Sequence, residues 1–128
     1  MVSPRVGETR CVRVAVILVA LLLAGCGVPQ QLSKQAEEVH SVASEGALLA
    51  HEASEGSLDT FTSEHAKALQ KRLAELQPAI RNPDLEQLAA RVSELLRALA
   101  ERPGDRAFAA LIEEAFTSQA KAADELTG

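Results

Sequence analysis

Aromatic side chains are scarce in this sequence, which has no tryptophan or tyrosine and only three phenylalanines among 128 residues. Proteins that bind sugars or stack nucleic-acid bases usually do so on aromatic platforms, and this chain has almost no residues with which to build one. The sequence also contains no GxSxG, HExxH or P-loop motif and no other glycine-rich phosphate loop. We therefore expect no enzymatic activity, no cofactor and no small-molecule substrate.

A hydrophobic run long enough to span a membrane is also missing. The apolar run from Val14 to Leu23 has ten residues, and at about 1.5 Å per helical residue it covers about half of a ~30 Å hydrocarbon layer. Three arginines and one glutamate precede it, which keeps the start of the chain on the cytoplasmic side during export. The length, the basic start and the small residues that follow are typical of a secretory signal peptide.

The apolar run ends in the tetrapeptide Leu23-Ala24-Gly25-Cys26. This segment resembles the lipobox of bacterial lipoprotein signal peptides, in which a branched apolar residue and two small residues precede an invariant cysteine. The resemblance implies that the Cys26 thiol receives a diacylglyceryl group and that the chain is cleaved between Gly25 and Cys26. It also implies that the freed amine of Cys26 can be acylated, for example with palmitate. The resemblance covers residues 1–26 and carries no information about the rest of the chain.

Lipidation of Cys26 would hold the protein on the extracytoplasmic face of a bacterial membrane, because two or three acyl chains anchor stably where one binds reversibly. Residues 1–25 are then a cleaved signal peptide, and residues 26–31 are the lipidated cysteine with a short tether. The residue after the lipidated cysteine is Gly27 rather than an aspartate. By the same resemblance, this is compatible with delivery of the protein to an outer membrane, and attachment to the plasma membrane is the alternative. Cys11 is removed with the signal peptide, so the exported part has no disulfide and no CxxC site.

Basic residues are in the minority once the signal peptide is removed. Without its three arginines and one glutamate, the chain keeps ten lysines and arginines against seventeen aspartates and glutamates. An acidic protein is repelled by phosphate backbones and by anionic lipid headgroups. We therefore expect no nucleic-acid partner, and we expect the membrane to be held through the lipid on Cys26.

Four amphipathic segments follow and predict an all-α domain over residues 32–127. Their apolar residues recur at spacings of three and four, as on one face of a helix, and glycine or proline separates them. The segments are about 32–54, 58–77, 83–101 and 105–126. Short turns favour antiparallel neighbours, so we predict an up-down-up-down four-helix bundle. The alternative is a three-helix bundle of the last three segments with the first as a stalk or a partner-binding arm.

Local signals predict where these helices begin and end. Gly56 suits a C-terminal cap, and Ser57 or Thr60 suits the next N-cap. Asn82 and Asp105 predict the starts of the last two helices.

The first two segments differ in their apolar faces. The first has a seam of small residues that would let a partner helix approach closely, although Gly46 leaves a break there open. The second should end or kink near Pro78, which lacks an N–H. Its expected core stripe is Leu58, Phe61, Leu69, Leu73, Leu76 and Ile80.

One motif has the residue types of a metal site. In Glu37-x-x-His40, a carboxylate and an imidazole three residues apart can both reach an ion inside a bundle. Di-iron bundles use two copies of this motif, whereas this chain has one. His51 shares the helix face of His40, and with His65 these residues define an alternative function as a metal-binding or metal-sensing bundle. Polar residues flanking a helix seam are the simpler interpretation.

The last helix has more apolar width than a single seam needs, because Leu111, Ile112 and Phe116 spread over a broad arc and Leu96 adds to it from the third helix. Such width indicates either deep burial or a contact surface for another helix. Burial in the bundle is the expected outcome. The sequence therefore predicts a binding, scaffolding or accessory domain with a possible protein partner along a helix face.

Overall fold

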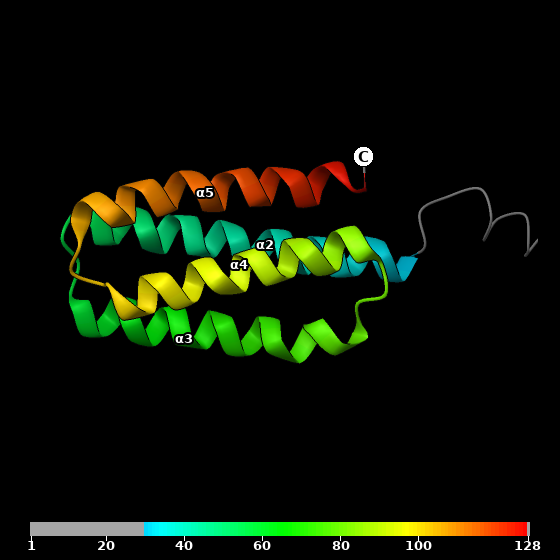
Figure 1. The fold of residues 1–128 in the computed structure, drawn as a ribbon, viewed down its shortest axis with the longest axis horizontal. Helices are drawn as coiled ribbons and strands as arrows, with labels where there is room; N and C mark the ends of the chain where they lie inside the picture. Colours follow the sequence, from blue (N-terminus) through cyan, green and yellow to red (C-terminus); the bar gives the residue numbers. More distant parts are fainter. Residues whose placement is uncertain (1–29, 128) are drawn as a thin grey trace, which may run out of the picture.

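The computed structural model describes residues 30–127, which fold into four helices joined by short connections (Figure 1). The helices are α2 (Gln30–Ser54), α3 (Asp59–Leu76), α4 (Pro83–Glu101) and α5 (Arg106–Glu125), and a 3-10 helix, η1 (Gln77–Ala79), follows α3. They alternate in direction, with α2 packed most closely on α5 and α3 on α4. The predicted all-α, up-down-up-down four-helix bundle is confirmed.

The two ends of the bundle differ in what they contain. At the end named here the tether end, α2 begins, α5 ends and η1 leads from α3 toward α4 (Figure 1). At the opposite turn end, α2 turns into α3 and α4 turns into α5. The predicted signal peptide and lipobox lie outside the described residues. None of the four helices within residues 30–127 combines the length and apolar character needed to cross a bilayer.

Three of the predicted helix boundaries are confirmed by their capping geometry. Gly56 has a φ of 97°, a left-handed conformation that glycine adopts without strain after a helix. The side-chain oxygen of Asn82 accepts hydrogen bonds from the backbone N–H groups of Asp84 (2.9 Å) and Leu85 (3.1 Å). Asp105 caps α5 by accepting from the N–H of Phe108 at 3.0 Å. These acceptors satisfy N–H groups that have no partner within their helix.

At the turn end, each of the two turns lies against the start of a helix from the other hairpin. A Cβ placed on Gly56, in the first turn, would lie 2.8 Å from Cζ of Arg106 at the start of α5. A Cβ on Gly104, in the second turn, would lie 2.9 Å from Oδ2 of Asp59 at the start of α3. All four residues are exposed, so each turn contacts the end of a surface side chain from the other hairpin.

The predicted N-cap of α3 is wrong. The helix begins at Asp59, and its N-cap is Leu58, whose side chain has no acceptor to offer. The Ser57 hydroxyl instead pairs with the hydroxyl of Thr62 at 2.9 Å. Thr60 lies inside the first turn of the helix. The bond between Ser57 and Thr62 removes the nearest hydroxyl from capping, so the first N–H groups of α3 lack a side-chain acceptor.

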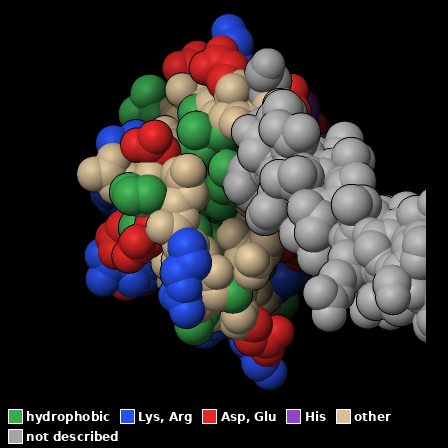
Figure 2. All heavy atoms as spheres, turned by 90° about the vertical axis from the view of Figure 1, so that its right-hand side faces the viewer, with side chains coloured by type: hydrophobic (Ala, Val, Ile, Leu, Met, Phe, Trp, Pro, Cys, Tyr) green, Lys and Arg blue, Asp and Glu red, His purple; other side chains and the backbone are tan. Residues whose placement is uncertain are grey.

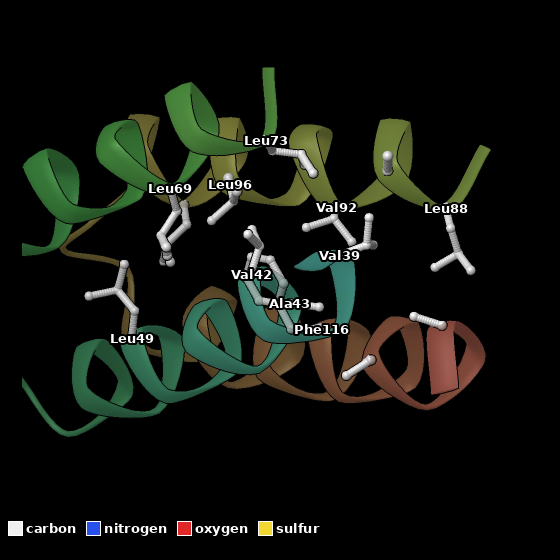
Figure 3. Packing of buried hydrophobic residues seen from close by; sticks show 14 of the residues in the cluster. Val39, Val42, Ala43, Leu49, Leu69, Leu73, Leu88, Val92, Leu96 and Phe116 are labelled. Atoms are coloured by element: carbon white, nitrogen blue, oxygen red, sulfur yellow. The ribbon is translucent and has the colours of Figure 1, made fainter. Parts of the chain in front are cut away.

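The core is a single cluster of apolar side chains contributed by all four helices. Figure 3 shows these side chains filling the space between α2 and α5 on one side and α3 and α4 on the other. The largest apolar side chains that are fully buried are Phe116, Leu49, Leu73, Leu85, Leu96, Leu99, Val39, Val42 and Val92. Burial of apolar area of this kind is the main favourable term in the folding free energy.

Helix α2 is continuous and belongs to the core, so the stalk alternative is wrong. The helix runs through Gly46 without a break and buries nine of its residues. Alanine and glycine make up five of these nine residues, so the predicted seam of mostly small residues is confirmed. At Gly46 the two helices are in close contact, because a Cβ there would lie 2.7 to 2.9 Å from three carbons of the Phe116 ring.

The predicted core stripe of α3 is partly wrong. Leu69, Leu73 and Ile80 are buried, but Leu58 is 79% exposed and Phe61 is 50% exposed. In their place α3 buries Thr62 and Ala66. Residue 62 lies about 100° around the helix from residue 61, and the hydroxyl of Thr62 can be buried because Ser57 supplies its hydrogen bond. Leu76 is partly buried against the cluster.

Candidate functional site

The seam between α2 and α5 holds two of the histidines singled out in the sequence. Nδ1 of His40 lies 2.8 Å from the backbone carbonyl oxygen of Ala120. A carbonyl oxygen only accepts, so the proton sits on Nδ1. Nε2 of His40 is 3.5 Å from the hydroxyl of Ser44. His40 therefore joins α2 to α5, and its second nitrogen lies near Ser44 of its own helix.

An open groove of about 400 Å³ lies along this seam. Its walls are Ala47 and Ser44 with His40 on α2, and Thr117, Ala120, Lys121 and Asp124 on α5. The lining combines one cationic group, one carboxylate and several hydroxyl or imidazole groups. Most of the lining area is nevertheless apolar, so the groove is an apolar surface with a few hydrogen-bond donors and acceptors.

His51 makes the second connection across the seam. Its Nδ1 lies 3.1 Å from a carboxylate oxygen of Glu113 on α5, and its Nε2 lies 3.1 Å from Glu55 at the end of α2. The hydrogen bond with Glu113 raises the pKa of His51 above its ordinary value, and the charges of Glu113 and Glu55 add to this effect. The imidazole is about half exposed, so this is a surface contact between helices that strengthens when the ring is protonated.

His65 lies on α3, away from the seam. Its ring meets that of Phe61 edge-on, with the ring centres 5.5 Å apart. Its Nδ1 is buried and has no hydrogen-bond partner among the described residues. His65 thus belongs to the partly exposed aromatic pair at the start of α3.

Arg72 of α3 donates hydrogen bonds to three acceptors on α2, a contact that the sequence pattern does not predict. Arg72 donates from Nε to Glu38 (2.5 Å), from Nη1 to Glu45 (3.1 Å) and from Nη2 to the Ser41 hydroxyl (3.3 Å). The three acceptors are spaced by three and four residues and so share one face of α2. The hydrogen bond with Glu38, assisted by Glu45, raises the pKa of Arg72 further above its ordinary value, so the guanidinium stays charged.

The four residues proposed as metal ligands are distributed over two faces of the bundle. His40 and His51 both contact α5, as their eleven-residue spacing predicts. Glu37 and His40 line one small pocket of about 70 Å³ together with Asp124 of α5, whereas His65 lies on α3 against Phe61. Within residues 30–127, no three His, Cys, Asp or Glu side chains are grouped so as to hold a metal ion. The metal-binding alternative stays a prediction without support from the geometry.

A second groove, of about 390 Å³, lies on the outer face of the pair α4 and α5. Its lining is mostly apolar and consists of Ala90, Arg91, Glu94, Leu95, Ala115 and Gln119. Leu111, one helical turn before Ala115 on α5, is 67% exposed. Ile112 and Phe116 are buried, so of the broad apolar arc predicted for this helix, Leu111 is the part left at the surface.

The chain matches no protein-family model, no curated protein and no solved structure.

The tether end has a mixed surface. Figure 2 looks onto this end and shows acidic and basic side chains interspersed, with hydrophobic side chains between them, over the atoms that are described. Interspersed charges of opposite sign partly cancel each other's field toward a charged surface.

Proposed function

We propose that this chain is a lipid-anchored lipoprotein of the bacterial cell envelope, whose four-helix bundle is a binding or scaffolding domain on the extracytoplasmic face. The observation that carries the proposal is Cys26, which follows Leu23, Ala24 and Gly25 directly after an arginine-bearing start and a ten-residue apolar run. Two or three acyl chains on this cysteine would supply stable membrane attachment.

The position of the bundle in the chain supports this proposal. Helix α2 begins at Gln30, four residues after Cys26, and four residues reach at most about 14 Å when extended. A bundle attached by so short a tether stays close to the lipid surface. The mixed charges of the tether end are compatible with attachment through the lipid, since they provide no basic patch for anionic headgroups on the atoms described.

The surface of the bundle supports a role in binding. The groove between α4 and α5 is mostly apolar, and the neighbouring Leu111 exposes two thirds of its surface. Apolar groups gathered in a shallow groove along a helix pair are typical of surfaces that receive another helix.

Metabolic labelling tests the anchoring. Bacterial cells that express the full chain are supplied with radiolabelled palmitate, and the labelled protein is isolated. The parent chain should incorporate label, Cys26→Ser should incorporate none, and Cys11→Ser should be labelled like the parent because Cys11 is removed with the signal peptide. Mass spectrometry of the mature protein should find an acylated N-terminal Cys26. Equal labelling of the parent and Cys26→Ser would contradict the proposal.

A further inference from the structure

The residues of α4 that line the outer groove form a self-complementary pattern. Read forward, they are an apolar residue and a cation, then, after two intervening residues, an anion and an apolar residue: Ala90-Arg91-x-x-Glu94-Leu95. Read backward, the order of apolar residues is the same and the charges are exchanged. A surface with this property matches a copy of itself that has been turned end for end.

A twofold axis perpendicular to the helices brings two such surfaces together in antiparallel register. Arg91 then lies opposite Glu94 of the second copy, and Leu95 lies opposite Ala90 of the second copy. One register therefore satisfies both relationships, charge against opposite charge and apolar residue against apolar residue. Each contact occurs twice, because the axis relates the two copies.

The residues of α5 fit the same axis. Ala115 and Gln119 line the groove beside the four residues of α4, so they lie at the same level of the bundle. If the axis passes Ala115, Leu111 and Gln119 exchange places, because each is four residues from Ala115. The exposed Leu111 is then covered by Gln119 of the second copy.

We propose that the face of α4 and α5 is the contact between two copies of this chain, related by a twofold axis that passes near Ala115. Glu94 also forms an ion pair with Arg97 of its own helix at 2.5 Å. Both side chains are exposed, and exposed ion pairs are weak, so this pair competes little with the contact between Glu94 and Arg91 of the second copy. The small Ala115 at the axis lets the two copies of α5 approach closely.

The size of this face sets the expected strength of the contact. Helices of 19 and 20 residues lying side by side present a face of roughly 600 Å² on each copy. The total of about 1,200 Å² is at the lower limit for specific interfaces. The contact should therefore be reversible. If Cys26 is lipidated as proposed, two antiparallel copies anchored in one membrane would lie with their helices along its surface.

Cross-linking of the full chain in cells tests the proposal. Ala115→Cys places a thiol at the axis, where its Cβ can come within the ~4 Å that a disulfide needs. Oxidation or a short bismaleimide should give a species of twice the chain mass. The matched control is Ala68→Cys, an exposed alanine of α3, which should not cross-link. The parent chain measures any reaction of Cys11 and Cys26.

Charge exchange tests the register. In the Ala115→Cys background, Arg91→Glu sets two anions against each other, and Glu94→Arg sets two cations against each other. Each should lower the cross-linked fraction about fivefold. The double variant Arg91→Glu with Glu94→Arg restores opposite charges and should recover the parent fraction. Circular dichroism of each purified variant checks that the helices are intact, since a folded double variant that recovers cross-linking excludes a folding defect as the cause.

Three results would overturn the proposal. Equal cross-linking at positions 115 and 68 would show random collision, a product of another mass would show that a different protein occupies the face, and a double variant as weak as the single ones would reject the register. Palmitate labelling of the same samples tests the proposed anchoring separately. Cross-linking at position 115 without palmitate incorporation would contradict the anchoring and support the dimer. Palmitate incorporation without cross-linking would support the anchoring and contradict the dimer.

Discussion

The ring of Phe116 on α5 lies directly against Gly46 on α2. A Cβ added at Gly46 would fall 2.7, 2.8 and 2.9 Å from three ring carbons, and Phe116 is completely buried. A glycine in the middle of a 25-residue helix costs about 1 kcal/mol relative to alanine. The contact explains why glycine stands there: the ring occupies the volume that any side chain at position 46 would need.

Gly46→Ala should therefore destabilise the bundle, although alanine is the better helix former. Overpacking of a dense core costs about 1–3 kcal/mol, and the gain in helix propensity offsets only about 1 kcal/mol. We expect a net loss of about 1 kcal/mol in the free energy of unfolding, measured by urea denaturation of the chain that begins at Gly27.

The partner variant Phe116→Leu provides the control for this prediction. It should lower stability by itself, because a smaller side chain leaves a cavity. In its background, Gly46→Ala should become neutral or stabilising, since the added methyl group enters the space that the ring has left. A constant effect of Gly46→Ala in both backgrounds would show that the ring is not the obstacle.

Arg72→Ala should lower the free energy of unfolding by about 1 kcal/mol, and the loss should shrink in 1 M salt. The guanidinium donates to three acceptors of α2, whereas Lys67 Nζ and Glu64 Oε1 are exposed and 4.0 Å apart. Lys67→Ala is therefore the matched control and should change stability little. Arg72→Lys should recover part of the loss, since an ammonium retains the charge but not the planar fork.

His51 should make stability depend on pH. Its folded-state pKa is raised by Glu113 and Glu55, so protonation favours the folded chain. This contribution is complete below the unfolded-state pKa of about 6.5 and is lost as pH rises through the folded-state pKa. Urea midpoints of the parent and of His51→Gln should differ more at pH 5.5 than at pH 9. In the Glu113→Gln background, the difference between the two pH values should become smaller, and an unchanged difference would contradict the assignment.

Phe61→Gln should leave stability almost unchanged, within about 0.5 kcal/mol, because the ring is half exposed. Leu73→Ala, one of the completely buried positions of the same helix, should cost about 2–5 kcal/mol. Thermal unfolding followed by circular dichroism compares the two. Similar losses for both variants would mean that Phe61 is buried in solution, for example by a partner.

The sequence predicts the fold well where one periodicity dominates. In α4 the 3-4 spacing predicts an inward stripe of Leu85, Leu88, Val92, Leu95 and Leu99, and Asn82 supplies the start. Four of the five are buried, but Leu96 takes the buried position that the spacing gives to Leu95, which is only partly buried. In α3 two faces compete. Phe61 is more apolar than Thr62, so hydrophobicity favours the wrong face, and the hydroxyl bond that allows Thr62 to be buried appears only once Ser57 is placed.

The candidate site was less accessible to prediction. The spacing of His40 and His51 correctly places both on one face of α2, but their partners Ala120 and Glu113 depend on the register of two helices far apart in sequence. The same limit applies to Arg72, whose three acceptors are visible as a pattern on α2 while the donor is not. A hydrogen-bond partner requires a three-dimensional arrangement that no local pattern contains.

The anchoring of the connection after α3 decides where the chain can accept inserted residues. Ile80 is 4% exposed, and the carbonyl oxygen of Ala79 accepts a hydrogen bond from Nε2 of Gln35 on α2, so lengthening this connection would displace a core side chain. The turn at Gly104 is exposed, and the atoms nearest to it belong to the end of the Asp59 side chain. An epitope tag or an evolutionary insertion should therefore be tolerated around Gly104 and rejected around residues 79–81.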